Sequence, residues 1–344
     1  MKRLRERGVP FEIWSTYQHT DILDRAIEFL EAPSPSFVFA RGVKGQPIEK
    51  ALQMVPWLLT CFRSLRRNRK RLRQRLGENP LVIVHGDTVT TVFGALAAKF
   101  LKVPSAHIEA GLRSGNLLRP FPEEIDRRIV GMLATTHFAP NAKAVETLRG
   151  KDAVNTLRNT AVDGVLDTIS DRPAPIEKPY GLVLLHRFEF MQQPGFIKQT
   201  LEALDRTTPV PLYILTDVYS GGPITNALKA IGSDKISTIP KLTYPDFVNA
   251  MANAELVVTD SGGAQQELGL IGTPTLLHRQ VTESPDGIGA NILLSKWDLA
   301  TVEQFMRTYE TFRVPLVRPE HLPSEIIIDA LVKRGYVSPA PTES

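Results

Sequence analysis

Residues able to do acid–base chemistry follow two short apolar segments in the first half of the chain. Residues 81–84 and 104–108 each have the character of a short buried strand. Asp87 lies just beyond the first segment and Glu109 directly beyond the second, each two residues after a histidine. Because the parallel strands of an open α/β sheet end at one edge, where such sheets bind ligands, the two carboxylates are predicted to lie close together. We infer an active site for proton transfer at this edge.

A third carboxylate, Glu123, begins the next predicted helix, directly after Pro122. Like charges crowded in one cleft raise some carboxyl pKa values, so that one carboxyl can serve as an acid while another serves as a base. Each acid also has a structural alternative: Asp87 could cap the helix that follows it, and Glu123 with Glu124 could favour a helix start. Glu109 is hardest to explain in this way, because its neighbours are small or apolar.

His85 and His107 raise a second alternative, since each lies two residues ahead of a carboxylate. Imidazole and carboxylate groups together suit zinc or manganese. No helical pair of histidines and no cysteine ligand supports a metal here, so the sequence favours a site without a metal. Both histidines are then either substrate contacts or buried core residues.

Two further motifs occur in the second half of the chain. His186 follows an apolar segment, and residues 261–263, Ser-Gly-Gly, connect another apolar segment to a helix. The backbone amides at such a helix start form a site for a diphosphate, which glycine allows to approach closely. The structural alternative is an ordinary serine-capped helix with Gln265 and Glu267 exposed.

The motifs in this order resemble the bacterial, non-hydrolysing UDP-N-acetylglucosamine 2-epimerase family. The resemblance runs from about residue 15 to residue 294 and rests on His-Gly-Asp-Thr at 85–88, His-Ile-Glu-Ala-Gly-Leu-Arg at 107–113, Pro-Glu-Glu at 122–124, His-Arg-Phe-Glu at 186–189 and Asp-Ser-Gly-Gly-Ala-Gln-Gln-Glu at 260–267. It implies four catalytic residues, which are Asp87, Glu109, Glu123 and His186.

The same resemblance implies contacts with a UDP-sugar. The residues at matching positions are Ser261, Gly262, Gly263, Glu267, Arg279, Arg113, Gln18, His19 and His85. Glu267 matches the glutamate that binds the ribose. Ser284 stands where the family has an arginine, which implies a changed affinity or a changed substrate. Tyr244 and Phe247 are expected to pack in a helix rather than stack on uracil.

Strand-like and helix-like segments alternate along the chain, which predicts an α/β fold with parallel sheets. By resemblance the fold is two Rossmann-like, doubly wound domains facing a cleft, as in the GT-B glycosyltransferases. The predicted parts are an N-terminal domain with the acidic cluster (1–170), a linker dense in proline and charge (171–180), a C-terminal nucleotide-binding domain (181–320), and a helix and tail that pack back on the N-terminal domain (321–344).

The amino end departs from the family pattern. The sequence opens with a predicted helix and the strand 11–16, and no segment ahead of that strand matches the family's first strand or its Gly-Thr-Arg-Pro-Glu loop. The first strand of a doubly wound sheet is central. We therefore expect that the start codon was assigned too far downstream or that the chain is truncated, and that turnover is reduced.

Composition restricts the classes of protein that remain. The chain has 344 residues, a net charge of +4 and a single cysteine, Cys61, which fits a reduced cytoplasm. No apolar run suits a signal peptide or a membrane span. Basic residues concentrate in 63–75, where Leu65 and Leu72 recur at helical spacing. This pattern favours an amphipathic helix with a solvated basic face, with weak binding to polyanions as the alternative.

The sequence therefore predicts a cytoplasmic enzyme that interconverts UDP-N-acetylglucosamine (UDP-GlcNAc) and UDP-N-acetylmannosamine (UDP-ManNAc), or a close analogue. By resemblance it works through elimination of UDP to a 2-acetamidoglucal, needs no cofactor, and forms a homodimer that contacts neither membrane nor specific nucleic acid. The alternatives are a hydrolysing epimerase that releases UDP and ManNAc, and a non-catalytic UDP-sugar-binding relative. A GT-B glycosyltransferase is disfavoured, because transfer does not need this acidic cluster.

Overall fold

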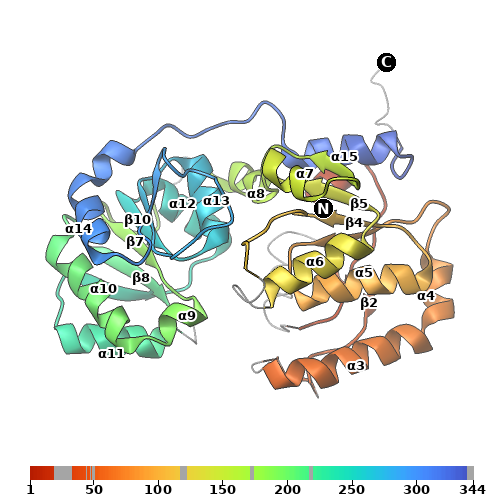
Figure 1. Ribbon diagram of the computed structural model, residues 1–344, viewed down its shortest axis with the longest axis horizontal. Helices are drawn as coiled ribbons and strands as arrows, with labels where there is room; N and C mark the ends of the chain where they lie inside the picture. The colour runs from red at the N-terminus through yellow and green to blue at the C-terminus, as the bar shows by residue number, and fades with distance from the viewer. Residues whose placement is uncertain are drawn as a thin grey trace. The chain divides into compact units, whose positions relative to one another are not determined.

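The protein is described by a computed structural model in which the chain forms two compact units (Figure 1). Unit 1 comprises Met1–Asn159 and His321–Ser344, and unit 2 comprises Thr160–Glu320. The structure describes residues 1–18, 33–43, 45–46, 48, 51–116, 122–170, 174–216 and 220–338. The helix predicted near residues 22–30 and the predicted contact residue His19 lie outside the described residues.

Unit 1 is built on a four-stranded parallel sheet with the order β3-β4-β5-β6. Its strands are β3 (Val82–His85), β4 (Ser105–Ile108), β5 (Thr136–Ala139) and β6 (Asp152–Asn155). Two shorter strands, β1 (Trp14–Ser15) and β2 (Phe37–Val38), form a separate parallel pair. Because His85 is in register with Ile108, the segments that follow β3 and β4 leave the sheet at the same edge.

The described helices of unit 1 pack against this sheet, against the β1–β2 pair or against one another. They are α1 (Lys2–Glu6), α3 (Ala51–Arg67), α4 (Arg69–Arg75), α5 (Val89–Leu101), α6 (Glu123–Leu133), α7 (Ala142–Thr147) and α15 (Pro323–Lys333). Phe93 of α5 packs with Trp57 of α3 in one cluster. Leu331 of α15 packs with Ala106 and Phe138 of the sheet in another, so the late helix α15 completes the core of unit 1.

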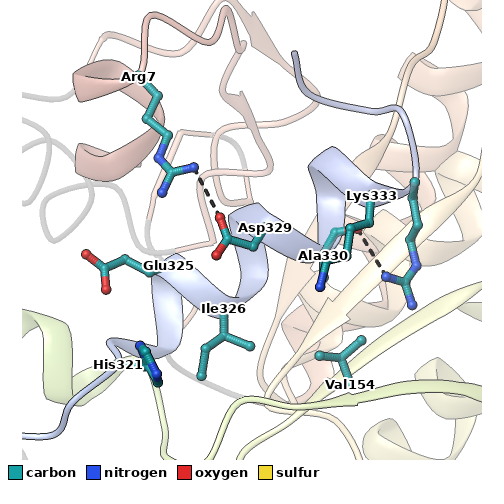
Figure 2. A pocket seen from close by; sticks show the side chains of 9 residues that line it. Arg7, Val154, His321, Glu325, Ile326, Asp329, Ala330 and Lys333 are labelled. Carbon is teal, nitrogen blue, oxygen red and sulfur yellow. Dashed lines mark hydrogen bonds and ion pairs between the residues drawn. The ribbon is translucent and has the colours of Figure 1, made fainter. Parts of the chain in front are cut away.

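Helix α15 is also tied to the start of the chain by charge (Figure 2). Arg7, just after α1, lies 3.2 Å from Asp329 through its Nη1 atom. Arg334, beyond the end of α15, contacts Asp152 of β6. The hollow beside these pairs has a volume of about 540 Å³, and its lining includes none of the residues predicted for the active site.

Unit 2 contains a six-stranded sheet with the order β12-β11-β10-β7-β8-β9, all of its pairs parallel. Its strands are β7 (Gly181–Leu184), β8 (Leu212–Thr216), β9 (Ile236–Pro240), β10 (Leu256–Thr259), β11 (Thr275–Leu277) and β12 (Ile292–Leu294). Leu184 of β7 is in register with Thr259 of β10. The predicted motifs after these two strands therefore begin side by side.

Two groups of helices cover the faces of the unit 2 sheet. The helices are α8 (Ala161–Thr168), α9 (Phe188–Met191), α10 (Pro194–Thr207), α11 (Gly221–Ile231), α12 (Tyr244–Asn253), α13 (Gly262–Ile271), α14 (Leu299–Thr308) and the 3-10 helix η1 (Tyr309–Phe312). Helices α10, α11 and α14 share one apolar cluster, and α8, α12 and α13 share the other. The predicted α/β class with parallel sheets is confirmed.

The compact units differ from the predicted domains at one boundary. Helix α8 lies before the predicted linker, but its residues Val162 and Val165 pack in the cluster of unit 2. The contacts of an amphipathic helix, rather than the density of proline, thus decide where the unit begins. The division into functional domains stays a prediction.

The basic segment forms two helices rather than the single helix that the sequence predicts. Helix α3 ends at Arg67 and α4 begins at Arg69, and the intervening Asn68 donates a side-chain hydrogen bond to the carbonyl of Ser64. Leu65 and Leu72 are buried, as their spacing suggests. Cys61 is also buried, and burial raises the pKa of its thiol to about 12.

A close approach of backbones follows β4, where Gly111 has a φ of +84°. A Cβ at this position would lie 2.2 Å from the carbonyl oxygen of Ala144 in α7. We expect Gly111→Ala to lower the free energy of unfolding by about 3 kcal/mol, because it adds overpacking to an unfavourable φ. Gly150 is the matched control, since its φ is +81° but no atom lies within 4 Å of such a Cβ.

Gly150→Ala should lower the free energy of unfolding only by the cost of the left-handed backbone conformation, about 1 kcal/mol. Urea unfolding of the two variants measures the difference. Equal losses would mean that the loop after β4 relaxes away from α7 without penalty.

Candidate functional site

Glu109 occupies a strained position at the end of β4. Its φ is +67°, a left-handed conformation that is uncommon for residues other than glycine and is concentrated at functional sites. Its Oε2 atom lies 3.9 Å from Nε2 of His85, and a Cβ at Gly86 would lie 3.7 Å from the same oxygen. The carboxylate therefore lies over the turn that leads from β3 to Asp87.

Asp87 does not cap the helix that follows it. Thr88 is the N-cap of α5, and its hydroxyl accepts a hydrogen bond from the amide of Thr91. Asp87 instead pairs with the buried Arg127 of α6, with 2.6 Å between Oδ2 and Nη2. The structural alternative for Asp87 is therefore wrong.

The first turn of α6 adds further acids to the cluster. Glu123 is the first residue of this helix, and Asp126 on the same turn is buried. Oε2 of Glu123 and Oδ2 of Asp126 are buried atoms without a hydrogen-bond partner among the described residues. Burial, and then the charges of Asp87 and Glu123, raise the pKa of Asp126 to about 6. Asp126 is thus an acid that the motifs did not predict.

Glu124 is the most enclosed acid of this helix, with no exposed surface. It accepts hydrogen bonds from the amide of Ser114 and from Nε of Arg128, both at 3.0 Å. Arg113 donates to the carbonyl of Leu112 at 2.7 Å; burial lowers the pKa of its guanidinium, and the charge of Glu124 opposes this shift. Glu124 therefore holds the loop after β4 against α6, beside the predicted Arg113.

His107 is a core residue of the sheet, whereas His85 keeps a half-exposed ring. Nε2 of His107 lies 2.8 Å from the carbonyl oxygen of Gly86, so this nitrogen carries the proton. On the neighbouring strand β5, His137 is in register with His107 and equally buried. Burial lowers the pKa of both histidines to about 4.

The two histidines make the stability of unit 1 depend on pH. The unfolded chain binds protons below about pH 6.5, while the folded state resists them until about pH 4, so the free energy of unfolding falls as the pH drops through this range. In urea titrations between pH 4 and 7, His137→Asn should reduce the slope by up to about 1.4 kcal/mol per pH unit. An unchanged slope would mean that His137 titrates normally in the folded protein.

In unit 2, Asp260 orients the predicted catalytic residue His186. Asp260 is 1% exposed and accepts hydrogen bonds from the amides of His186 and Arg187, both at 2.9 Å. Its Oδ1 atom lies 3.5 Å from Nδ1 of His186. Burial raises the pKa of this carboxyl, and the neighbouring His186 opposes that shift.

The start of α13 has the features of an anion site. Ser261 is its N-cap, and its hydroxyl accepts a hydrogen bond from the amide of Ala264. The amides of Gly262 and Gly263 have no partner within the helix, because the first amides of a helix point out of its start. Arg279 is buried beside Gly262, where a Cβ would lie 3.3 Å from its Nη1 atom. Arg279 pairs with Glu283 through Nη2, at 3.1 Å. Among the described residues, its buried Nη1 has no hydrogen-bond partner, so a donor is left for a ligand.

Gln265 and Glu267 are buried, so the alternative that leaves them exposed is wrong. Nε2 of Gln265 donates to the carbonyl oxygens of Ser284 and Asp286, at 2.9 and 3.1 Å. The hydroxyl of Ser284 is itself bonded to the carboxylate of Asp286. Ser284 is thus engaged within its own loop, where the family pattern has an arginine.

Glu267 has a partner that the motifs did not predict. Oε1 of Glu267 accepts a hydrogen bond of 2.9 Å from the hydroxyl of Tyr244 on α12. Burial raises the pKa of Glu267 to about 7. Tyr244 and Phe247 pack against the apolar cluster of α12 and α13.

In unit 1, Gln18 accepts a hydrogen bond from Thr90 of α5 at 3.1 Å.

Apart from Gln18, which contacts Thr90 of α5, the described site residues gather into two clusters, one in each unit. Unit 1 brings together Asp87, Glu109, Glu123, Arg113 and His85, and unit 2 brings together His186, Ser261, Gly262, Gly263, Glu267 and Arg279. The polar partners that were not among the predicted site residues are Asp126, Arg127, Asp260, Tyr244 and Glu283.

Comparison with known proteins identifies the family. A family model described as UDP-N-acetylglucosamine 2-epimerase matches residues 70–309. A protein of Ralstonia solanacearum named probable UDP-N-acetylglucosamine 2-epimerase is 34% identical over 301 residues, covering 80% of this chain and 76% of the relative. The chain belongs to the UDP-N-acetylglucosamine 2-epimerase family. The resemblance inferred from the motifs is confirmed.

Other members of the epimerase family match over different lengths. The UDP-N-acetylglucosamine 2-epimerase of Bacillus subtilis is 35% identical over 227 residues, which span 62% of this chain and 59% of that relative. The crystal structure of the Neisseria meningitidis epimerase bound to UDP-GlcNAc has 26% identity and a TM-score of 0.74, with 92% of this chain and 90% of that chain covered. Acinetobacter baumannii MurG, at 14% identity and a TM-score of 0.53, shares the GT-B-like fold alone.

Two further observations concern this member of the epimerase family. Across the described ranges, no cluster of three or more histidine, cysteine or acidic side chains is arranged to hold a metal ion. Within the same part of the chain, no helix has the length and apolar character needed to cross a membrane.

Proposed function

We propose that the chain interconverts UDP-GlcNAc and UDP-ManNAc, or a closely related UDP-2-acetamido sugar. In the proposed reaction a base takes the proton from C2 and the bond between C1 and the UDP oxygen breaks, with its electron pair leaving on UDP. The product is a 2-acetamidoglucal. Addition of a proton to the other face of C2 and attack of UDP on C1 then give the epimer.

The observation that carries this proposal is the acidic cluster at the carboxyl ends of β3 and β4. Glu109 lies over the turn that leads to Asp87, and Asp87 interacts electrostatically with Asp126, which interacts in turn with Glu123. The cluster therefore places a carboxyl with a raised pKa, that of Asp126, among other carboxyl groups. A base and an acid are then available in one place, as proton removal and return require.

The leaving group is proposed to bind unit 2. A diphosphate suits the amides at the start of α13 together with Nη1 of Arg279, which has no hydrogen-bond partner in the described part of the chain, because both favour negative charge. The buried carboxylate of Glu267 suits the hydroxyls of a ribose. His186, fixed by Asp260, is proposed to act beside the departing phosphate.

Isotope exchange tests the proposal. The protein is incubated with UDP-GlcNAc in deuterated water and the sugars are analysed by NMR. We expect deuterium at C2 of both UDP-GlcNAc and UDP-ManNAc, because the elimination discards the original proton. Retention of that hydrogen in both epimers would contradict the elimination mechanism.

The products distinguish the remaining alternatives. A hydrolysing enzyme would release free ManNAc and an equal amount of UDP, and a non-catalytic relative would bind UDP without giving either product. A chelator should leave the rate unchanged if no metal takes part. The homodimer stays a prediction from the family resemblance, which light scattering can test.

A further inference from the structure

Three helices of unit 2 meet at the hydroxyl of Tyr244. Tyr244 is the first residue of α12, and its hydroxyl donates to Oε1 of Glu267 in α13 at 2.9 Å. Gly164 of α8 lies on the other side of this hydroxyl, since a Cβ at Gly164 would be 2.9 Å from the Tyr244 oxygen. The tyrosine hydroxyl is therefore enclosed between a glycine on one helix and a carboxylate on another.

We propose that Tyr244 is a positioning residue that orients the Glu267 carboxylate toward the ribose hydroxyls of a bound uridine nucleotide. The absence of a side chain at Gly164 leaves the space that the Tyr244 hydroxyl occupies. The inference rests on the proposed function, in which Glu267 binds the ribose. Nothing in the motifs assigns a role to Tyr244 or to Gly164.

The hydrogen bond fixes which oxygen of Glu267 serves a ligand. An ionised carboxylate accepts through both oxygens, so a bond from Tyr244 to Oε1 leaves Oε2 to accept from a hydroxyl. Glu267 is 8% exposed, and burial favours its neutral form, whereas the bond from Tyr244 favours the ionised form and lowers its pKa. Tyr244 thus keeps the carboxylate oriented and able to accept a hydrogen bond from a ligand hydroxyl.

Gly164 supports the same conclusion, because glycine is an unfavourable residue inside a helix. Glycine inside a helix costs about 0.5–1 kcal/mol relative to alanine. Here alanine would place a methyl group against the Tyr244 hydroxyl, at a distance that real Cβ contacts do not show. Gly164→Ala is therefore expected to push the hydroxyl away from Glu267 without weakening α8.

A purely structural role for Tyr244 predicts something different, because its ring also packs against the apolar cluster of α8, α12 and α13. Loss of packing would lower the melting temperature and weaken every ligand of the site alike. Loss of positioning would weaken only ligands that carry ribose hydroxyls. A nucleotide without these hydroxyls separates the two roles.

The experiment measures the affinities of UDP and of 2′,3′-dideoxy-UDP for the full chain by calorimetry. Tyr244→Phe should lower the affinity for UDP by about tenfold, which corresponds to the loss of one charge-assisted hydrogen bond. The affinity for dideoxy-UDP should not change. Gly164→Ala should weaken UDP selectively with no fall in melting temperature. Tyr180→Phe is the control, because it removes the hydroxyl of a fully buried tyrosine that donates to the carbonyl of Ala250 at 2.9 Å rather than to Glu267.

Each outcome decides the inference. Equal weakening of both nucleotides in Tyr244→Phe, or wild-type affinity for UDP, would overturn the positioning role, whether or not the protein isomerises UDP-GlcNAc. Selective weakening in a protein without isomerase activity would support the positioning role and contradict the proposed reaction. Failure of the wild-type chain to bind UDP would overturn both.

Discussion

Replacement of Glu109 by glutamine is expected to slow deuterium exchange at C2 by about 10²–10⁴-fold, the range that a positioned acid or base contributes. Glutamine keeps the size of the side chain and its place over Gly86 but can neither take nor return a proton. Because the nucleotide is proposed to bind unit 2, the affinity for UDP should change little. Exchange rates and UDP calorimetry on the same preparation measure both quantities.

A matched control for this substitution lies in the same unit. Glu146 of α7 is an exposed glutamate, so Glu146→Gln removes the same charge away from the cluster and should leave the exchange rate unchanged. A Glu109→Gln protein with near-normal exchange would remove Glu109 from the proposed catalytic residues. The base would then have to be sought among Asp87, Asp126 and Glu123.

Replacement of Arg127 by methionine is expected to lower the free energy of unfolding of unit 1 by about 3–5 kcal/mol. Arg127 is 6% exposed and its guanidinium lies between Asp87, at 2.6 Å, and the fully buried Glu124, at 3.8 Å. Methionine fills the space but removes the cation that pairs with Asp87 and leaves Glu124 with Arg128 alone. Urea unfolding at pH 7 gives the difference.

Arg128 provides the control, because it pairs with the same Glu124 from the same helix at 3.0 Å but has a side chain that is 48% exposed. Arg128→Met should cost about 1 kcal/mol or less, as water already screens this pair. Similar losses for both variants would mean that burial does not strengthen the Arg127 pair. A stable Arg127→Met protein would contradict the proposed contribution of the Arg127 pairs to stability.

The sequence predicted the strands that carry the motifs. β3, β7 and β10 are short, nearly continuous apolar runs, and β4 was predicted although it contains Ser105 and His107. β3, β4, β7 and β10 are found where the runs lie, and the motifs follow their carboxyl ends. Parallel pairing then brings neighbouring motifs together whatever the intervening length. The edge at which the candidate site forms was therefore predictable from local pattern alone.

Strands β5 and β6 were missed because polar residues interrupt them, and β12 (Ile292–Leu294) was missed although it is apolar. β5 contains Thr136 and His137 in a fully buried strand, and β6 begins with the exposed Asp152 at the edge of the sheet. Their strand conformation is imposed by neighbours rather than by composition. A neutral buried histidine resembles an apolar residue only once the sheet around it exists.

The missed members of the site share one property, which is that their partners are remote in sequence. Asp260 binds the amides of His186 and Arg187 across two adjacent strands, and Tyr244 reaches Glu267 from another helix. Their residue types are ordinary at a strand end or a helix start. Only the folded arrangement reveals which side chain each one meets.

The division of unit 1 into two separate stretches of chain has a consequence for biosynthesis. Strands β3 to β6 leave the ribosome first, but the α15 residues that cover Ala106 and Phe138 are added only after all of unit 2. Unit 2 is continuous and can complete its core while unit 1 still waits with an uncovered apolar face. The unit that is translated first is thus the unit whose core is completed last.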